Sequence, residues 1–200
     1  MMNLLQTLFN SINGLTNDYG ITIVSLTILF NVILLPLNIK QKKSMNLMQN
    51  LSEEANIIKQ KYKNNKAKMD EEIQQLYSSN AKSYLGILLM FIQMPAAIVM
   101  YRFFTKNITS VSTVIFPWLT SLSVPDPYFI LPILYVLVQI VPNLLVSMSI
   151  LKTTKIPRLS KQVLITPTIM AVLLVSNIPS AIGIYLLTTS LVQSTQRIFL

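Results

Sequence analysis

The chain has 200 residues, of which 52% are hydrophobic and only 12% are charged, about half the charged fraction that is usual in a soluble domain. It contains no Cys and no His, which excludes disulfides, thiol chemistry, Cys/His metal sites and imidazole catalysis. Its apolar runs are continuous and lack the alternation of a transmembrane barrel. We therefore predict an all-α polytopic membrane protein that forms a single domain over residues 1–200.

Residues 1–18 carry apolar side chains at three- and four-residue spacing, with Asn and Gln between them. This pattern is typical of an amphipathic helix. The segment is too polar to span a bilayer, and we expect it to lie at the membrane interface. Packing against the rest of a helical bundle is the alternative. Met1 and Met2 are followed by no nearby Lys or Arg, so we expect no signal peptide at this start.

The uncharged run Gly20–Ile39 leads into a cluster of lysines. A helix of about 20 residues is ~30 Å long, the thickness of the hydrocarbon core of a bilayer, so we predict the first transmembrane helix at residues 20–38. Pro36 lies in its last turns and is expected to kink it. Asn31 lies just past its midpoint, where a side-chain amide must find a partner because lipid offers none.

Residues 40–83 form a polar insert with nine of the sixteen basic residues and five of the seven acidic ones. Two helical patterns flank Lys63-Asn64-Asn65-Lys66, which is a natural turn, so we predict a helical hairpin outside the membrane. Its methionine-rich stripe is suited to be an adaptable contact surface. The alternative is that the stripe only holds the two helices together.

Four further transmembrane helices are predicted, at residues 84–104, 128–150, 163–178 and 180–196. Residues 107–125 are uncharged but rich in Ser and Thr, and we predict a loop with a short interfacial helix and Trp118 at headgroup level. The last two spans are only ~24–26 Å long, which indicates local thinning of the membrane.

Five spans fix the orientation. If the hairpin lies inside the cell, fourteen of the sixteen basic residues are on the inner side, which is a strong positive-inside signal. We therefore predict an N-terminus outside and a C-terminus in the cytoplasm.

Uncharged polar side chains recur at mid-depth, or inward of it, in these predicted spans. They are Asn31, Gln93, Gln139, Asn143, Thr188, Thr189 and Gln193. Such groups are costly in lipid unless they face one another or water, and the outer halves of the spans are mainly apolar. We predict a hydrophilic groove that opens toward the cytoplasm and is closed toward the outside. Ordinary interhelical hydrogen bonding, worth ~0.6–2 kcal/mol per contact, is the alternative.

Several motifs together resemble the YidC/Oxa/Alb family of membrane-protein insertases. The first span and the hairpin contribute Tyr19-Gly20, Pro36-Leu37, Lys40-Gln41, Ser44-Met45, Met48-Gln49 and Lys59-Gln60-Lys61-Tyr62. The later spans contribute Gly86, Gln93-Met94-Pro95, Pro125-Asp126-Pro127-Tyr128, Ile130-Leu131-Pro132-Ile133-Leu134, Pro179, Tyr185 and Gln196. Each motif is weak by itself, but their order and spacing are specific.

The resemblance implies a membrane-protein insertase and chaperone of the bacterial cell membrane. The groove would receive polar segments of nascent membrane proteins, with no energy source beyond binding, hydrophobic transfer and the membrane potential. The hairpin would recruit substrate, through the residues Met45, Met48, Lys59, Lys61 and Tyr62. Contacts with the lipid bilayer, the ribosome and the Sec translocon are likewise implied. No cofactor, metal or nucleic-acid specificity is expected.

The chain departs from the family pattern at its groove, because the family's groove arginine falls on Asn31. The aromatic residue that often follows the last-span tyrosine is Leu186 here. We expect a hydrogen-bonding groove that is less selective for acidic substrate tails.

Two other functions would use the same side chains. A small channel or carrier would line its pore with these amides, but it needs a polar path to the outer face, which the sequence does not show. A structural subunit would use them as interhelical hydrogen bonds. An enzyme is disfavoured, because no span core carries Asp, Glu, Lys or Arg, or a nucleophile paired with a base.

Overall fold

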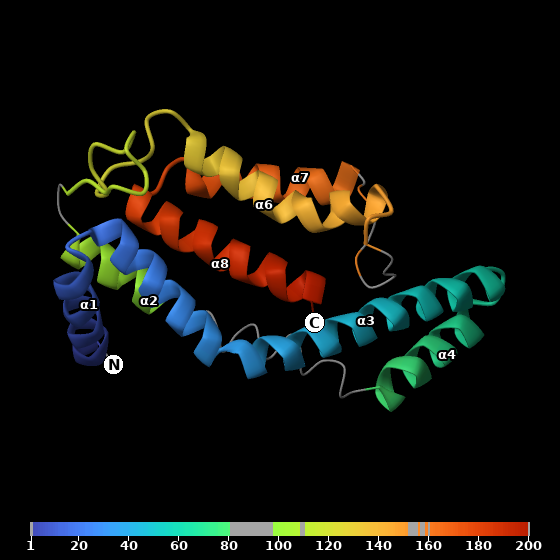
Figure 1. The fold of residues 1–200 in the computed structure, drawn as a ribbon. Helices are drawn as coiled ribbons and strands as arrows, with labels where there is room; N and C mark the ends of the chain where they lie inside the picture. The colour runs from blue at the N-terminus through green and yellow to red at the C-terminus, as the bar shows by residue number, and fades with distance from the viewer. Residues whose placement is uncertain are drawn as a thin grey trace. The chain divides into compact units, whose positions relative to one another are not determined.

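The computed structural model describes residues 2–80, 98–108, 111–151, 156, 159 and 161–199. These residues form helices, turns and bends, and the described ranges contain no strand (Figure 1). Contacts divide the chain into two units, one of Met1–Ile33 with Ile98–Leu200 and one of Leu34–Ala97. The all-helical prediction is confirmed for these ranges.

The first unit is a helical bundle in which α8 packs against both α2 and α6 (Figure 1). Its elements are α1 (Met2–Thr16), α2 (Tyr19–Ile33), a helix at 98–107, α6 (Ile130–Ser147), α7 (Lys161–Met170), the π-helical segment η2 (Ala171–Val175) and α8 (Ser180–Phe199). The spans that the sequence predicts at 128–150, 163–178 and 180–196 overlap α6, α7 with η2, and α8. Residues 81–97, with most of the predicted second span, lie outside the described ranges.

Loop 111–129 closes one end of this bundle, which we call the loop end. Ser180, the first residue of α8, donates its backbone N–H to the Val124 carbonyl at 2.8 Å. Asp18, just before α2, accepts a hydrogen bond from Thr113, and α6 follows the loop directly. Helices α2, α6 and α8 therefore all start at the loop end and run away from it.

The apolar core lies at the loop end. Buried aliphatic side chains come from the first turns of α2, α6 and α8, and a row of aromatic rings connects α1 to α8. Ring centroids are 5.3 Å apart for Phe9 and Phe103, 5.7 Å for Phe103 and Phe104, and 5.9 Å for Phe104 and Tyr185. Such tilted aromatic pairs add to the stabilisation that burial provides. The loop end is therefore held together mainly by apolar and aromatic side chains.

Helix α1 packs against α2. Its apolar stripe is buried in the core through Leu5 and Phe9, while Leu4 and Leu15 remain exposed. The packed alternative is therefore the arrangement found. The depth of α1 in the bilayer stays a prediction.

The loop corrects one expectation. Within residues 111–129 the structure has turns and bends but no helix, so the predicted short interfacial helix is absent from this part of the chain. Pro117, Pro125 and Pro127 interrupt the segment, and proline is unfavourable in a helix interior. Trp118 is half-buried and packs edge-on against Phe116, with ring centroids 5.3 Å apart.

The second unit is the predicted helical hairpin, formed by α3 (Leu35–Lys61) and α4 (Lys66–Ser79). Pro36 lies in the first turn of α3, where its missing N–H costs nothing, so the predicted span 20–38 is divided between α2 and α3. Asn65 caps α4 by accepting the Lys68 backbone N–H at 3.2 Å, which explains the turn that the sequence predicts.

By length and composition, α6 is the helix in the described ranges that could cross a membrane by itself. Tyr19–Ile33 passes the same test only when it is counted together with Leu35–Gln41. The five-span architecture therefore remains a proposal.

Candidate functional site

Asn31 is buried where α2 meets α8. Its amide Nδ2 donates to the Thr27 carbonyl one turn earlier, at 2.9 Å, and to Thr189 Oγ1 on α8, at 3.4 Å. Thr27 is itself buried and donates to the Ile23 carbonyl. The amide predicted to need a partner thus finds one on its own helix and one on the neighbouring helix.

A second set of polar contacts joins α6 to the other side of α8. Gln139 Nε2 donates to Ser190 Oγ at 3.4 Å, and Ser194 Oγ donates to the Val138 carbonyl at 3.0 Å. Asn143 is fully buried one turn further along α6. Its carbonyl accepts the hydroxyl of Ser147 at 2.9 Å.

These contacts form one level of the bundle, which we call the polar layer and define as Asn31, Gln139, Thr189, Ser190 and Ser194. At ~1.5 Å per residue, Asn31 lies ~18 Å along α2 and Gln139 ~14 Å along α6. Thr189 lies ~14 Å along α8. The three helices run the same way from the loop end, so the polar layer lies beyond the apolar core.

The predicted groove residues are therefore brought together only in part. Asn31, Gln139 and Thr189 join the polar layer, and Thr188 is buried beside it on α8. Gln193 is exposed, and Gln93 lies outside the described residues. Ser190 was not predicted from the sequence. Its four-residue spacing to Ser194 on the uncharged run of α8 is the signal that could have indicated it.

A buried carboxylate holds the loop end together. Asp18 accepts hydrogen bonds from the backbone N–H groups of Ile21, at 2.8 Å, and Val114, at 2.7 Å, and from Thr113 Oγ1 at 2.7 Å. Burial raises the pKa of the Asp18 carboxyl, but these hydrogen bonds outweigh it, and the pKa lies below the ordinary 3.8. These hydrogen bonds connect the start of α2 to the loop.

Close packing accompanies this carboxylate. A Cβ on Gly20 would lie 2.1 Å from Thr113 Oγ1 and 2.7 Å from Thr113 Cβ. Only glycine fits at this position, because any side chain would displace the hydroxyl that Asp18 binds.

The motif Pro125-Asp126-Pro127-Tyr128 has a structural role at the start of α6. Asp126 is buried and accepts the backbone N–H groups of Tyr128, at 3.0 Å, and Leu131, at 2.6 Å. It satisfies donors that the first turn of a helix cannot satisfy itself. The motif therefore fixes where α6 begins.

The hairpin residues predicted to recruit substrate differ in their exposure. Lys59 and Lys61 are exposed, Met48 is half-buried, and the side chain of Met45 lies outside the described residues. Tyr62 lies between two ammonium groups, with Lys61 Nζ 5.2 Å and Lys68 Nζ 5.8 Å from its ring centroid. Its hydroxyl donates to Glu72 at 3.4 Å. These contacts hold the two hairpin helices together at the turn.

The described residues contain no group of His, Cys, Asp or Glu that could hold a metal ion. The polar layer offers hydroxyls and amides with no charge among them. Its members are hydrogen-bond donors and acceptors, and none of them is Asp, Glu, Lys or Arg.

Polar groups inside and apolar groups outside define the class of this protein. Leu, Ile and Val side chains are widely exposed on α6 and η2, among them Ile133, Leu137, Val172 and Leu173, while hydroxyls and amides bond to one another within the bundle. This pattern is that of an α-helical membrane protein, whose surface faces lipid.

The comparisons with known proteins identify the family. The model of the 60Kd inner membrane protein family matches residues 11–200. The chain belongs to this family, whose members include the YidC-type membrane protein insertases.

Curated relatives differ in how much of their length the chain covers. The membrane protein insertase YidC of Fusobacterium nucleatum is 31% identical over 98% of this chain and 92% of its own length. That of Clostridium perfringens is 39% identical over 72% of the chain and 65% of its own length. That of Geobacter sp. strain M21 is 28% identical over 92% of the chain but only 34% of its own length.

A solved structure supports the fold. The crystal structure described as an active YidC insertase with its first transmembrane domain resolved matches 99% of this chain and 45% of that chain, with a TM-score of 0.63 and 23% identity. The likeness supports the all-helical fold that the resemblance implied.

Proposed function

We propose that this protein inserts nascent membrane proteins into the bilayer and assists their folding. In this proposal the polar layer is the deepest part of a hydrophilic groove. The observation that carries the proposal is the polar layer itself, where three helices direct hydroxyls and amides toward one another. Its partners would be small nascent membrane proteins, with the ribosome and the Sec translocon as further contacts. The relatives that bear the insertase name support this function.

In this proposal the loop end faces outward, and five spans surround a groove that opens to the cytoplasm. The core of Phe9, Ile23, Leu26, Phe103 and Phe104 would close the outer side. A channel or carrier needs a continuous polar path, and these apolar side chains offer none. A charge at the centre of a bilayer costs about 2.5–3.5 kcal/mol on insertion scales, so a wet groove that reaches half-way lowers the barrier for a polar segment.

Complementation of an insertase-depleted bacterial strain tests the function. Wild type should restore growth and insertion of a small reporter membrane protein. Gln139→Leu, which removes the amide that bonds Ser190, should lower insertion several-fold. Val141→Leu is a matched control, because Val141 lies two residues away and is exposed on the opposite face of α6. Failure of wild type to complement, or equal insertion by both variants, would contradict the proposal.

Asn31 sets the expected substrate preference. It takes the place of the family's arginine, and its amide binds by hydrogen bonds without a positive charge. We expect wild type to insert reporters with acidic and neutral tails about equally, and Asn31→Arg to favour acidic tails. Identical behaviour of both variants on both tails would refute this expectation.

A further inference from the structure

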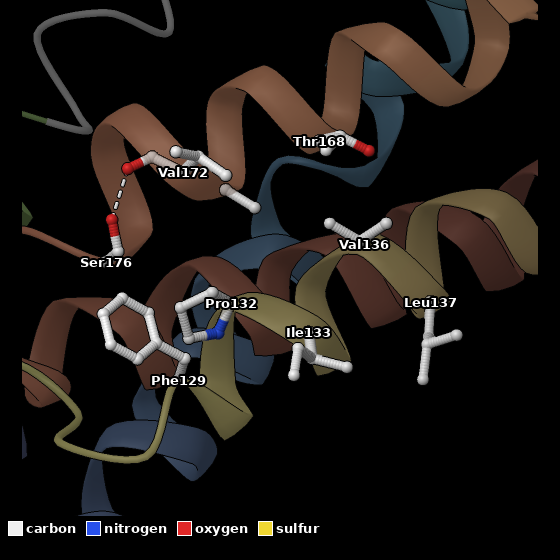
Figure 2. Close-up of a pocket in the computed structure, with 9 residues that line it drawn as sticks. Phe129, Pro132, Ile133, Val136, Leu137, Thr168, Val172 and Ser176 are labelled. Atoms are coloured by element: carbon white, nitrogen blue, oxygen red, sulfur yellow. Dashed lines mark hydrogen bonds between the residues drawn. The ribbon is translucent and has the colours of Figure 1, made fainter.

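A groove of about 390 Å³ lies between α6 and the last turns of α7 with η2. Figure 2 shows the two walls, with Phe129, Pro132 and Val136 on one side opposite Ser176, Val172 and Thr168 on the other. The volume is within the range of pockets that hold small organic ligands. None of the residues that line the groove belongs to the polar layer.

The groove is apolar throughout. One wall consists of Phe129, Pro132, Ile133, Val136 and Leu137, and the other of Thr168, Ala171, Val172 and Ser176. Its two hydroxyls are already bonded within their own helix, since Thr168 donates to the Leu164 carbonyl at 2.7 Å and Ser176 donates to the Val172 carbonyl (Figure 2). A ligand there would gain dispersion and hydrophobic contacts rather than hydrogen bonds.

Local helix chemistry explains why the groove exists. Pro167 lies inside α7, and the chain then widens into the π-helical segment η2. Extra residues of this kind alter the packing of a helix against its neighbour and are frequent at functional sites. Ala171 lines the groove and has almost no exposed surface, so a small side chain stands where a larger one would fill the space.

The groove is continuous with the lipid-facing surface of the protein. Ile133 and Leu137 on α6, and Val172 and Leu173 on η2, are each more than half exposed, and α6 is long and apolar enough to cross the membrane. In an inner membrane protein this surface meets hydrocarbon. The molecules that surround the mouth of the groove are therefore lipids.

The dimensions select the occupant. From Phe129 to Leu137 the groove follows α6 for eight residues, ~12 Å, close to half of the ~30 Å hydrocarbon core. We propose that this groove binds one acyl chain of a bilayer phospholipid, which fills the space between α6 and η2.

A photoreactive phospholipid with a diazirine in its acyl chain tests the proposal in liposomes that contain the full chain. Crosslinks should concentrate in peptides from both walls, residues 129–137 and 168–176. Two filling variants, Ala171→Leu and Val136→Phe, act from opposite walls, and each should lower these crosslinks at least fivefold. Leu173→Phe is the matched control, because Leu173 is exposed on η2 but does not line the groove, and it should leave the yield unchanged.

Several outcomes would overturn the proposal. Crosslinks spread evenly over all exposed apolar faces, or equal yields in the filling and control variants, would show that lipid only surrounds the protein. Capture of a reporter substrate by a photoreactive residue at position 136 would assign the groove to protein instead. If Ala171→Leu does not fold, Val136→Phe alone decides. The assay is independent of insertion, so its failure would leave the proposed function untouched.

Discussion

Replacement of Gly20 by alanine tests how the loop end is held. The new Cβ would lie 2.1 Å from Thr113 Oγ1, so Thr113 must move by more than 1 Å to reach ordinary contact. That shift breaks the 2.7 Å hydrogen bond from Thr113 to Asp18 and strains the 2.7 Å bond from the neighbouring Val114 N–H. A hydrogen bond to a charged group contributes about 1.5–3 kcal/mol.

The expected loss follows from these terms. Two weakened bonds to Asp18 cost about 3–6 kcal/mol, and the higher helix propensity of alanine offsets at most about 1 kcal/mol. Gly20→Ala should therefore lower the free energy of unfolding by about 2–5 kcal/mol, measured by SDS titration from mixed micelles.

Two matched variants make the measurement specific. Gly14→Ala adds the same methyl group to α1, where nothing lies within 4 Å, and should stabilise by up to about 1 kcal/mol. In a Thr113→Gly background the clash is gone, so Gly20→Ala should cost less than about 1 kcal/mol. The reasoning is refuted if Gly20→Ala is as stable as Gly14→Ala, or if its full cost persists in the Thr113→Gly background.

Three further predictions concern single side chains. The lowered pKa of Asp18 contributes stability that is present above the unfolded-state pKa and is lost as the pH falls through the folded-state pKa, which lies below the ordinary 3.8. Asp18→Asn should reduce this loss of unfolding free energy at acidic pH in unfolding titrations. An unchanged pH dependence would contradict the role of Asp18 at the loop end. Asp126→Ala removes the acceptor of the Tyr128 and Leu131 N–H groups and should cost about 2–4 kcal/mol in the same titration, whereas a loss below about 0.5 kcal/mol would show that water replaces it. Ser194→Ala removes the bond to the Val138 carbonyl and should cost no more than about 1–2 kcal/mol, since a larger loss would mean that the polar layer serves mainly to hold the helices together.

The sequence predicts the helices well because their signals are local. The apolar run before the lysine cluster, the Asn65 turn and the uncharged segment after Lys161 each carry their own periodicity or cap. The loop at 111–129 is predicted less well. Its apolar residues permit a helix, but the prolines and the bonds to Asp18 and Ser180 dictate turns. Those partners are 56 to 96 residues away in the chain.

The partners of the buried polar residues are also difficult to predict from the sequence. Their presence and depth can be inferred from the sequence, but their partners depend on the rotation of each helix about its axis. Asn31 meets Thr189 across 158 residues, and Gln139 meets Ser190 rather than another predicted groove residue. Asp18 and Asp126 are buried acceptors for backbone N–H groups, and their burial depends on distant segments of the chain that fold over them.

The proposed insertion mechanism requires water to reach the polar layer from the inner side of the membrane. The chain has no native Cys, so single cysteines at positions 139 and 141 can be compared in inside-out vesicles with a membrane-impermeant thiol reagent. Both lie at nearly the same depth on opposite faces of α6. We expect Gln139→Cys to be labelled rapidly from the inner side and Val141→Cys to remain unlabelled. Equal labelling of the two, or no labelling at position 139, would contradict it.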